Sequence, residues 1–101
     1  MQNKTINHVV LQVTLQDHLK RLEVAEFSKP LHQRRKIPNI PELGRITGIT
    51  RQSMYNLAAN RIDRVSLRTL SVVISELRQR GFPTEISDLL TAYPANASAE
   101  S

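Results

Sequence analysis

The chain has 101 residues, of which 40% are hydrophobic, and a formal net charge of +5. This length supports one hydrophobic core and therefore one domain. No apolar run approaches the roughly 20 residues that cross a bilayer, so the composition excludes a membrane-spanning helix. Cysteine is absent, which excludes disulfides and thiolate metal sites, and the polar N-terminal residues do not resemble a signal peptide.

Positive charge is concentrated in the middle of the chain. Between Lys29 and Arg80 there are eleven Lys or Arg residues and three acids, whereas residues 85–101 carry three acids and no base. A basic field attracts polyanions, and nucleic acid is the commonest soluble polyanion. The charge distribution therefore favours a nucleic-acid-binding protein, with a solvated basic surface as the alternative on charge alone.

The chain opens with a segment that alternates between apolar and polar residues, over residues 6–13. Val9, Leu11 and Val13 fall on one side of this segment, which is typical of a β-strand. An unpaired strand exposes backbone donors and acceptors that normally find a partner. We therefore expect residues 1–13 to form a strand that pairs with the same strand of a second chain, which makes it a candidate dimerisation element.

A helix and an irregular basic stretch follow the strand. Thr14 is a candidate N-cap, with Asp17 three residues later, where an acid reaches back to the cap. Leucines at helical spacing then predict a helix over residues 15–25. Between residues 26 and 39 two prolines interrupt the pattern and a basic cluster appears. A short helix after a cap at Ser28 is compatible with this stretch.

Two short helices separated by a glycine turn come next. A proline suits the first position of a helix over residues 41–47, where its missing N–H costs nothing. Gly48 supplies the positive φ that ends this helix. Thr50 is then placed to cap a helix over residues 51–59, and Asn60 tolerates a left-handed conformation at its end.

The C-terminal third predicts two further helices. Ser66 is placed to cap the first of them, and Gly81 to end it. Thr84 begins a last short helix, and residues 93–101 have too little apolar surface to fold, so we expect a disordered tail. The fold class is therefore mainly α, a small bundle of about five helices with a short N-terminal β-strand. Residues 14–92 form the DNA-binding domain, which contains a helix-turn-helix at about residues 40–61.

The glycine turn carries a recognisable motif. The lambda-repressor-like, or Xre, family of helix-turn-helix regulators has the turn Leu-Ala-x-x-x-Gly-[Val/Ile]-[Ser/Thr], and this chain resembles it at LGRITGIT, residues 43–50. Met54 and Leu57 follow at the spacing of the family's inward-facing residues. The resemblance implies a five-helix DNA-binding domain whose usual role is repression at an operator. The stretch IPELGRITGI, residues 40–49, is also similar to the opening of MerR-type regulators, which are the second choice.

The resemblance further implies that the helix beginning at Arg51 enters the major groove. Arg, Gln and Asn side chains read base edges there, so base contacts are expected from Arg51, Gln52, Tyr55 and Asn56. Packing on the domain surface is the alternative for Tyr55. Phosphate contacts are expected from residues that flank or precede the reading helices, namely Thr50, Ser53, Arg34, Arg35, Lys36, Arg61 and Arg64. A solvated loop is the alternative for the basic cluster at residues 34–36.

These features predict a sequence-specific, double-stranded DNA-binding transcriptional regulator of the cytoplasm, associated with the nucleoid. We expect a repressor of a mobile-element or phage-type operon, acting as a homodimer on an inverted repeat. The sequence leaves open whether the N-terminal strand or the C-terminal helix forms the dimer. No cofactor, metal, small-molecule ligand or membrane partner is expected, since the three histidines are scattered.

Other classes of function have less support in the sequence. An enzyme is not expected, because there is no nucleophile elbow or phosphate-cradling glycine loop. Recognition of single-stranded RNA needs clustered aromatic residues, and the four in this chain are dispersed. An antitoxin-type module that uses the same fold to hold a protein partner is the main alternative to the regulator.

Overall fold

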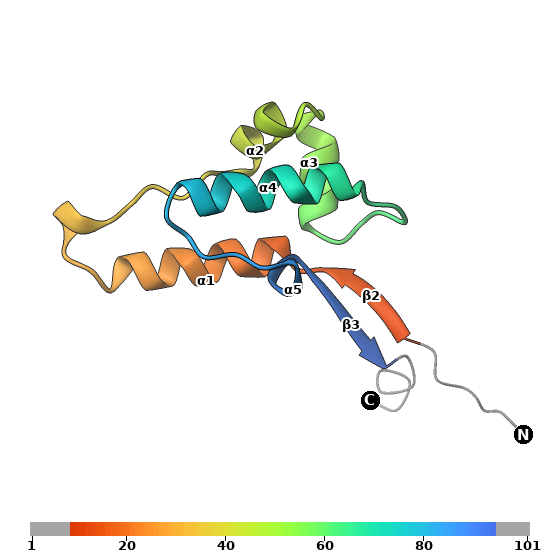
Figure 1. Cartoon of the computed structure of the whole chain (residues 1–101), viewed down its shortest axis with the longest axis horizontal. Coiled ribbons are helices and arrows are strands. Elements are labelled where there is room, and N and C mark those ends of the chain that lie inside the picture. Colours follow the sequence, from red (N-terminus) through yellow and green to blue (C-terminus); the bar gives the residue numbers. More distant parts are fainter. Residues whose placement is uncertain (1–8, 95–101) are drawn as a thin grey trace, which may run out of the picture.

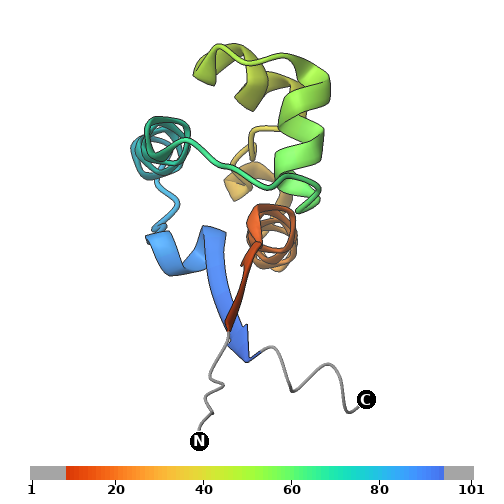
Figure 2. The same cartoon turned by 90° about the vertical axis from the view of Figure 1, so that its right-hand side faces the viewer.

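The computed structural model describes residues 9–94, which form a mainly helical bundle with a two-stranded ribbon. The long helices α1 and α4 have roughly parallel axes, α2 packs against α4, α3 packs against α2 and α1, and the ribbon projects from one end (Figures 1 and 2). The element order is β2 (Val9–Val13), α1 (Leu15–Phe27), the 3₁₀ helix η1 (Leu31–Gln33), α2 (Ile40–Thr47), α3 (Arg51–Ala58), α4 (Leu67–Gln79), α5 (Ile86–Leu89) and β3 (Leu90–Pro94). The predicted fold class, with five α-helices and a short N-terminal strand, is confirmed.

One hydrophobic core collects side chains from every α-helix. Met54 and Leu57, whose spacing predicts an inward face, are both buried. Burial of a side chain of this size contributes about 1.5–3 kcal/mol to the free energy of folding. The other buried hydrophobic residues are Val13, Leu15, Leu19, Leu43, Ala58, Leu70, Val73, Leu77, Phe82 and Leu89.

Local capping signals fix most of the helix ends as predicted. The Thr50 hydroxyl accepts the Ser53 N–H at 3.0 Å at the start of α3, and Ser66 caps α4 in the same way. Gly81 ends α4 with φ +92°, and the Phe82 N–H returns to the Leu77 carbonyl at 2.8 Å. These bonds satisfy backbone groups that a helix end leaves unpaired, so they form with little help from tertiary structure.

Thr14 is the N-cap residue of α1 as predicted, but its side chain makes a tertiary bond and no capping bond. Its hydroxyl donates to the Asp88 carbonyl at 2.9 Å, and its N–H donates to the Leu89 carbonyl at 2.8 Å. Thr14 therefore joins the start of α1 to α5. The helix itself extends two residues beyond the predicted end, to Phe27.

A second strand, β3, was not predicted. It pairs antiparallel with β2, with Val9 opposite Pro94 and Val13 opposite Leu90. The N-terminal strand therefore has a partner in its own chain, and the expectation that it lacks one is wrong. Tyr93 and Pro94, the first two residues of the expected tail, belong to this strand, whereas residues 1–8 and 95–101 lie outside the described part.

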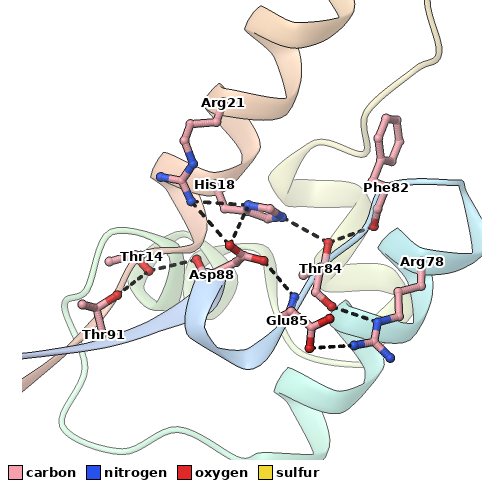
Figure 3. Close-up of polar contacts among 9 residues, drawn as sticks. All are labelled: Thr14, His18, Arg21, Arg78, Phe82, Thr84, Glu85, Asp88 and Thr91. Atoms are coloured by element: carbon pink, nitrogen blue, oxygen red, sulfur yellow. Dashed lines mark hydrogen bonds and ion pairs between the residues drawn. The ribbon is translucent and has the colours of Figure 1, made fainter.

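A polar cluster around His18 holds α5 against α1 (Figure 3). The buried His18 ring places Nε2 3.1 Å from the Thr84 hydroxyl and Nδ1 4.0 Å from the Asp88 carboxylate. Arg21 faces the same ring from α1, with Nη2 3.5 Å from Nδ1. Burial lowers the pKa of His18, although the Asp88 carboxylate acts in the opposite direction. The cluster is therefore built around a neutral imidazole.

We predict that this histidine makes the stability of the fold depend on pH. The folded state holds the His18 pKa below 6.5, so its contribution is complete above that pH and is lost as the pH falls toward the lowered value. The free energy of unfolding, measured by urea unfolding, should fall as the pH is lowered below about 6.5. His18→Gln, which bonds Thr84 without titrating, should remove this slope. His32→Gln, at an exposed position, should keep it, and equal slopes in both variants would contradict the assignment.

Candidate nucleic-acid interface

A tight turn between α2 and α3 positions the candidate reading helix. The backbone at Gly48 has φ +82°, and the Gly44 carbonyl accepts the N–H groups of Gly48 and Ile49 at 2.9 and 3.1 Å. These bonds end α2, and the extended Thr50 then begins α3. The chain thus changes direction within a few residues, which is the geometry of a helix-turn-helix.

The two helices approach closely at Gly44, where only a small residue fits. A Cβ atom at this position would lie 3.2 Å from the Ile49 carbonyl oxygen and 3.6 Å from the Met54 Cβ atom. Leu43 and Met54 are fully buried and fill the seam between the helices. Because the inner face of α3 is used for this contact, its outer face is left to solvent.

The outer face of α3 carries the residues expected to contact bases. Arg51, Gln52 and Tyr55 are exposed, and Asn56 is half-buried beside them. The Gln52 amide nitrogen donates to the Asn56 amide oxygen at 3.1 Å, which couples the two side chains. The Gln52 oxygen and the Asn56 nitrogen stay available as one acceptor and one donor, the pair of groups that an adenine edge requires. Four of the predicted site residues therefore share one surface.

Most arginines away from α3 have acidic partners. Arg21 pairs with Asp88, Arg35 with Glu26, Arg78 with Glu85, and Arg80 with both Glu42 and Glu76. Arg34 is the exception, because its partners are backbone carbonyls. Within residues 9–94 the other arginines without an acidic partner are exposed and lie on α3, the last turn of α2, the loop after α3 and the first turn of α4, namely Arg51, Arg45, Arg61, Arg64 and Arg68. Arginine charge without an acidic partner is therefore concentrated on α3 and the segments next to it.

Sequence reasoning missed two members of this group, Arg45 and Arg68. No acid lies three or four residues from Arg68, which is a signal that the sequence offers. Arg45 does have Glu42 three residues before it. That carboxylate binds Arg80 at 2.9 Å instead, and only the tertiary structure reveals this.

The basic cluster at residues 34–36 lies at the far end of the molecule from α3 (Figure 1). The Arg35 guanidinium binds the Glu26 carboxylate at 3.0 Å and the Gly81 carbonyl at 2.7 Å. Arg34 donates to two backbone carbonyls of its own loop. The structure therefore does not bring this cluster to the reading helix, and two of its three side chains stabilise the fold.

The tight turn, the exposed polar face of α3 and the arginines around it define a DNA-binding helix-turn-helix protein. The chain matches the family model of the Cro/C1-type helix-turn-helix DNA-binding domain over residues 29–94. It belongs to this family and is a DNA-binding regulatory protein, which confirms the lambda-repressor-like resemblance over the MerR-type one. No curated protein and no solved structure matches the chain. None of the helices within residues 9–94 is long and apolar enough to cross a membrane.

We predict that Gly48→Ala lowers the free energy of unfolding by about 1 kcal/mol, because a Cβ atom is strained at positive φ. No atom lies within 4 Å of the added methyl position, so the loss comes from backbone conformation and not from a clash. Gly48→Asn should lose less, since asparagine tolerates the left-handed region. Urea unfolding followed by circular dichroism measures both variants. An alanine variant as stable as the parent would show that the turn does not constrain the fold.

Proposed function

We propose that the protein is a sequence-specific transcriptional repressor that binds an inverted-repeat operator as a homodimer, in the cytoplasm and on the nucleoid. A mobile-element or phage-type operon is the proposed target. The observation that carries the proposal is the outer face of α3, where Arg51 and the coupled Gln52 and Asn56 amides lie among arginines without acidic partners. Such a surface joins groups that read bases to groups that hold phosphates.

Each residue of the interface has a proposed role. Arg51 reads guanine, the Gln52–Asn56 pair reads adenine, and Tyr55 packs against the edge of the groove. The N-terminus of α3 faces a backbone phosphate with the hydroxyl groups of Thr50 and Ser53. The phosphate set is completed by the exposed cations around α3, namely Arg45, Arg61, Arg64 and Arg68. Arg34 and Arg35 are not in this set, because both bind groups of the fold.

We predict that two arginine substitutions separate base reading from phosphate binding. Arg51→Ala should relax the preference at one position of each half-site, by about 1–3 kcal/mol of discrimination. Arg64→Ala should weaken binding to every sequence and make the salt dependence shallower, by about one unit in the slope of log K against log salt for each phosphate that is no longer neutralised. Binding of the chain and its variants to the DNA upstream of its own gene, and to a library of variants of that site, measures both.

Lys36→Ala is the control, since Lys36 is an exposed cation in the loop before α2 and is not among the cations assigned to the phosphates. It should leave affinity, base preference and salt dependence unchanged. A uniform loss of affinity in Arg51→Ala together with a changed base preference in Lys36→Ala would show that the basic cluster, and not α3, is the reader.

The β2–β3 ribbon is the element that we assign to dimerisation. Its apolar side chains Val9, Val10, Leu11 and Tyr93 are exposed. A ribbon of two strands is marginally stable in water, and further strands or a packed face are needed to stabilise it. A second copy of the same ribbon would supply both.

The backbone directions identify which edge of the ribbon is free to pair. The Val13 N–H donates to the Asn60 side-chain oxygen at 2.9 Å, so it points away from β3. Backbone groups alternate along an antiparallel strand, which directs the N–H groups of Val9 and Leu11 to the same outer edge. The outer edge of β3 is blocked at Pro94, which has no N–H. The outer edge of β2 is therefore the one that fits a second chain.

We predict that Leu11→Pro converts the dimer to a monomer and leaves the fold intact. The substitution removes an N–H that points away from β3, so the pairing within the chain is kept. Ile86→Ser, at an exposed apolar position of α5, is the control and should remain dimeric. Light scattering across a concentration series gives the mass, and circular dichroism checks the fold. A monomeric Ile86→Ser beside a dimeric Leu11→Pro would place the interface on α5 instead.

A further inference from the structure

Asn60 follows the reading helix in a left-handed conformation, with φ +62°. Its N–H donates to the Leu57 carbonyl at 3.1 Å, and the next N–H, that of Arg61, donates to the Asn56 carbonyl at 2.7 Å. These bonds attach the backbone of Asn60 to the last turn of α3. The other two residues with positive φ within residues 9–94 are glycines, which adopt this conformation with less strain. An asparagine at this position therefore points to a use of its side chain.

The Asn60 side chain reaches from the end of α3 to the ribbon. Its Oδ1 accepts the Val13 N–H at 2.9 Å, although the two residues are 47 positions apart. Figure 2 shows the end of α3 beside the point where β2 joins α1. Within residues 9–94 this is the only hydrogen bond between the ribbon and α3 or the loop after it. The amide of Asn60 thus links the two elements directly.

Two surface hollows border this bond, and Val13 and Asn60 line both of them. The first has a volume of about 290 Å³ and is also lined by Gln12 and Tyr93 of the ribbon. The second has a volume of about 120 Å³ and is also lined by Ile62 of the loop after α3. Open space therefore lies between the ribbon and the end of α3 beside the bond, and the Asn60 amide spans it.

The same bond limits the free edge of β2. The N–H groups of Val9, Leu11 and Val13 all point to the outer edge of the strand, because backbone groups alternate along an antiparallel pair. Since Asn60 accepts the Val13 N–H, a second chain that pairs with this edge finds free N–H groups only as far as Leu11. The partner strand would then end next to Asn60, which follows Asn56 of the reading face by about one helical turn.

We propose that Asn60 is a positioning residue for DNA reading, because it fixes the orientation of α3 relative to the ribbon and so sets the spacing of the two reading helices in the dimer. This inference rests on the proposed dimerisation through the ribbon. Each base pair added between two half-sites moves one of them by about 3.4 Å along the duplex and turns it by about 35° around the axis. A fixed orientation of α3 therefore becomes a preference for one half-site spacing.

Two substitutions at position 60 isolate the side-chain bond. Asn60→Gly keeps the positive φ without strain and removes the acceptor for the Val13 N–H. Asn60→Asp is the matched control, because aspartate tolerates the left-handed region and keeps an acceptor oxygen. Both variants should remain folded by circular dichroism and dimeric by light scattering.

The spacing preference is measured on DNA duplexes. One duplex carries the inverted repeat bound in the DNA upstream of the chain's own gene, and others have a centre one base pair longer or shorter. In Asn60→Gly the ratio of affinities between the best and the altered spacings should fall about fivefold, the factor that one hydrogen bond contributes. Asn60→Asp should keep the ratio of the parent. Base preference within each half-site should stay unchanged in both variants.

Several results would overturn the proposal. An unchanged ratio in Asn60→Gly, or an equal loss in Asn60→Asp, would show that the side-chain bond does not set the spacing. Lost base preference within the half-site would reduce Asn60 to a structural end of α3, and a monomeric Asn60→Gly would make it part of the interface itself. A parent chain that binds every spacing with equal affinity would contradict the ribbon dimer, and the role of Asn60 with it.

Discussion

The close contact between α2 and α3 at Gly44 is the constraint on which the functional geometry depends. A carbonyl oxygen of the turn lies 3.2 Å from the position of a Cβ atom at this residue, so a glycine fits there directly and another small residue fits only with a shift of a few tenths of an ångström. The approach commits the Met54 face of α3 to the core and turns Arg51 and Gln52 outward. A wider crossing would separate the helices, open the seam to water and change the direction of the reading face. The small residue therefore acts on function through packing alone.

Ion pairing determines which cations of this basic chain have an acidic partner and which do not. Arg80 binds Glu42 of α2 and Glu76 of α4, so it joins the first helix of the motif to α4. The hydrogen bonds from these carboxylates raise the pKa of Arg80, and the bond to Arg80 lowers the pKa of Glu42. Such pairs at a partly exposed surface add modest stability. Their larger effect is to neutralise arginines on α1, on the loop after it and on the second half of α4. Apart from Arg34, the arginines without acidic partners then lie on α3 and the segments next to it, where a polyanion would meet them.

Helix α1 joins parts of the fold that lie away from the proposed reading face on α3. The ribbon projects from the start of α1, and the loop that contains η1 follows its end (Figure 1). Thr14 and His18 hold α5 against α1, and Glu26 holds the loop by accepting the Arg35 N–H. The buried polar groups on α1 therefore stabilise the bundle and do not belong to the proposed reading face.

Local chemistry allowed the sequence by itself to determine the motif and the helix ends at Gly48, Thr50 and Ser66. These residues act within a few residues of themselves, and a cap or a left-handed residue needs no distant partner. The second strand and the partners of the loop after α1 were decided only by tertiary structure. The Thr14 hydroxyl bonds a carbonyl 74 positions away, and Arg35 bonds a carbonyl 46 positions away. A basic or hydroxyl side chain has the same appearance in the sequence whether it faces solvent, phosphate or protein, because its partner is chosen by the fold that brings distant segments together.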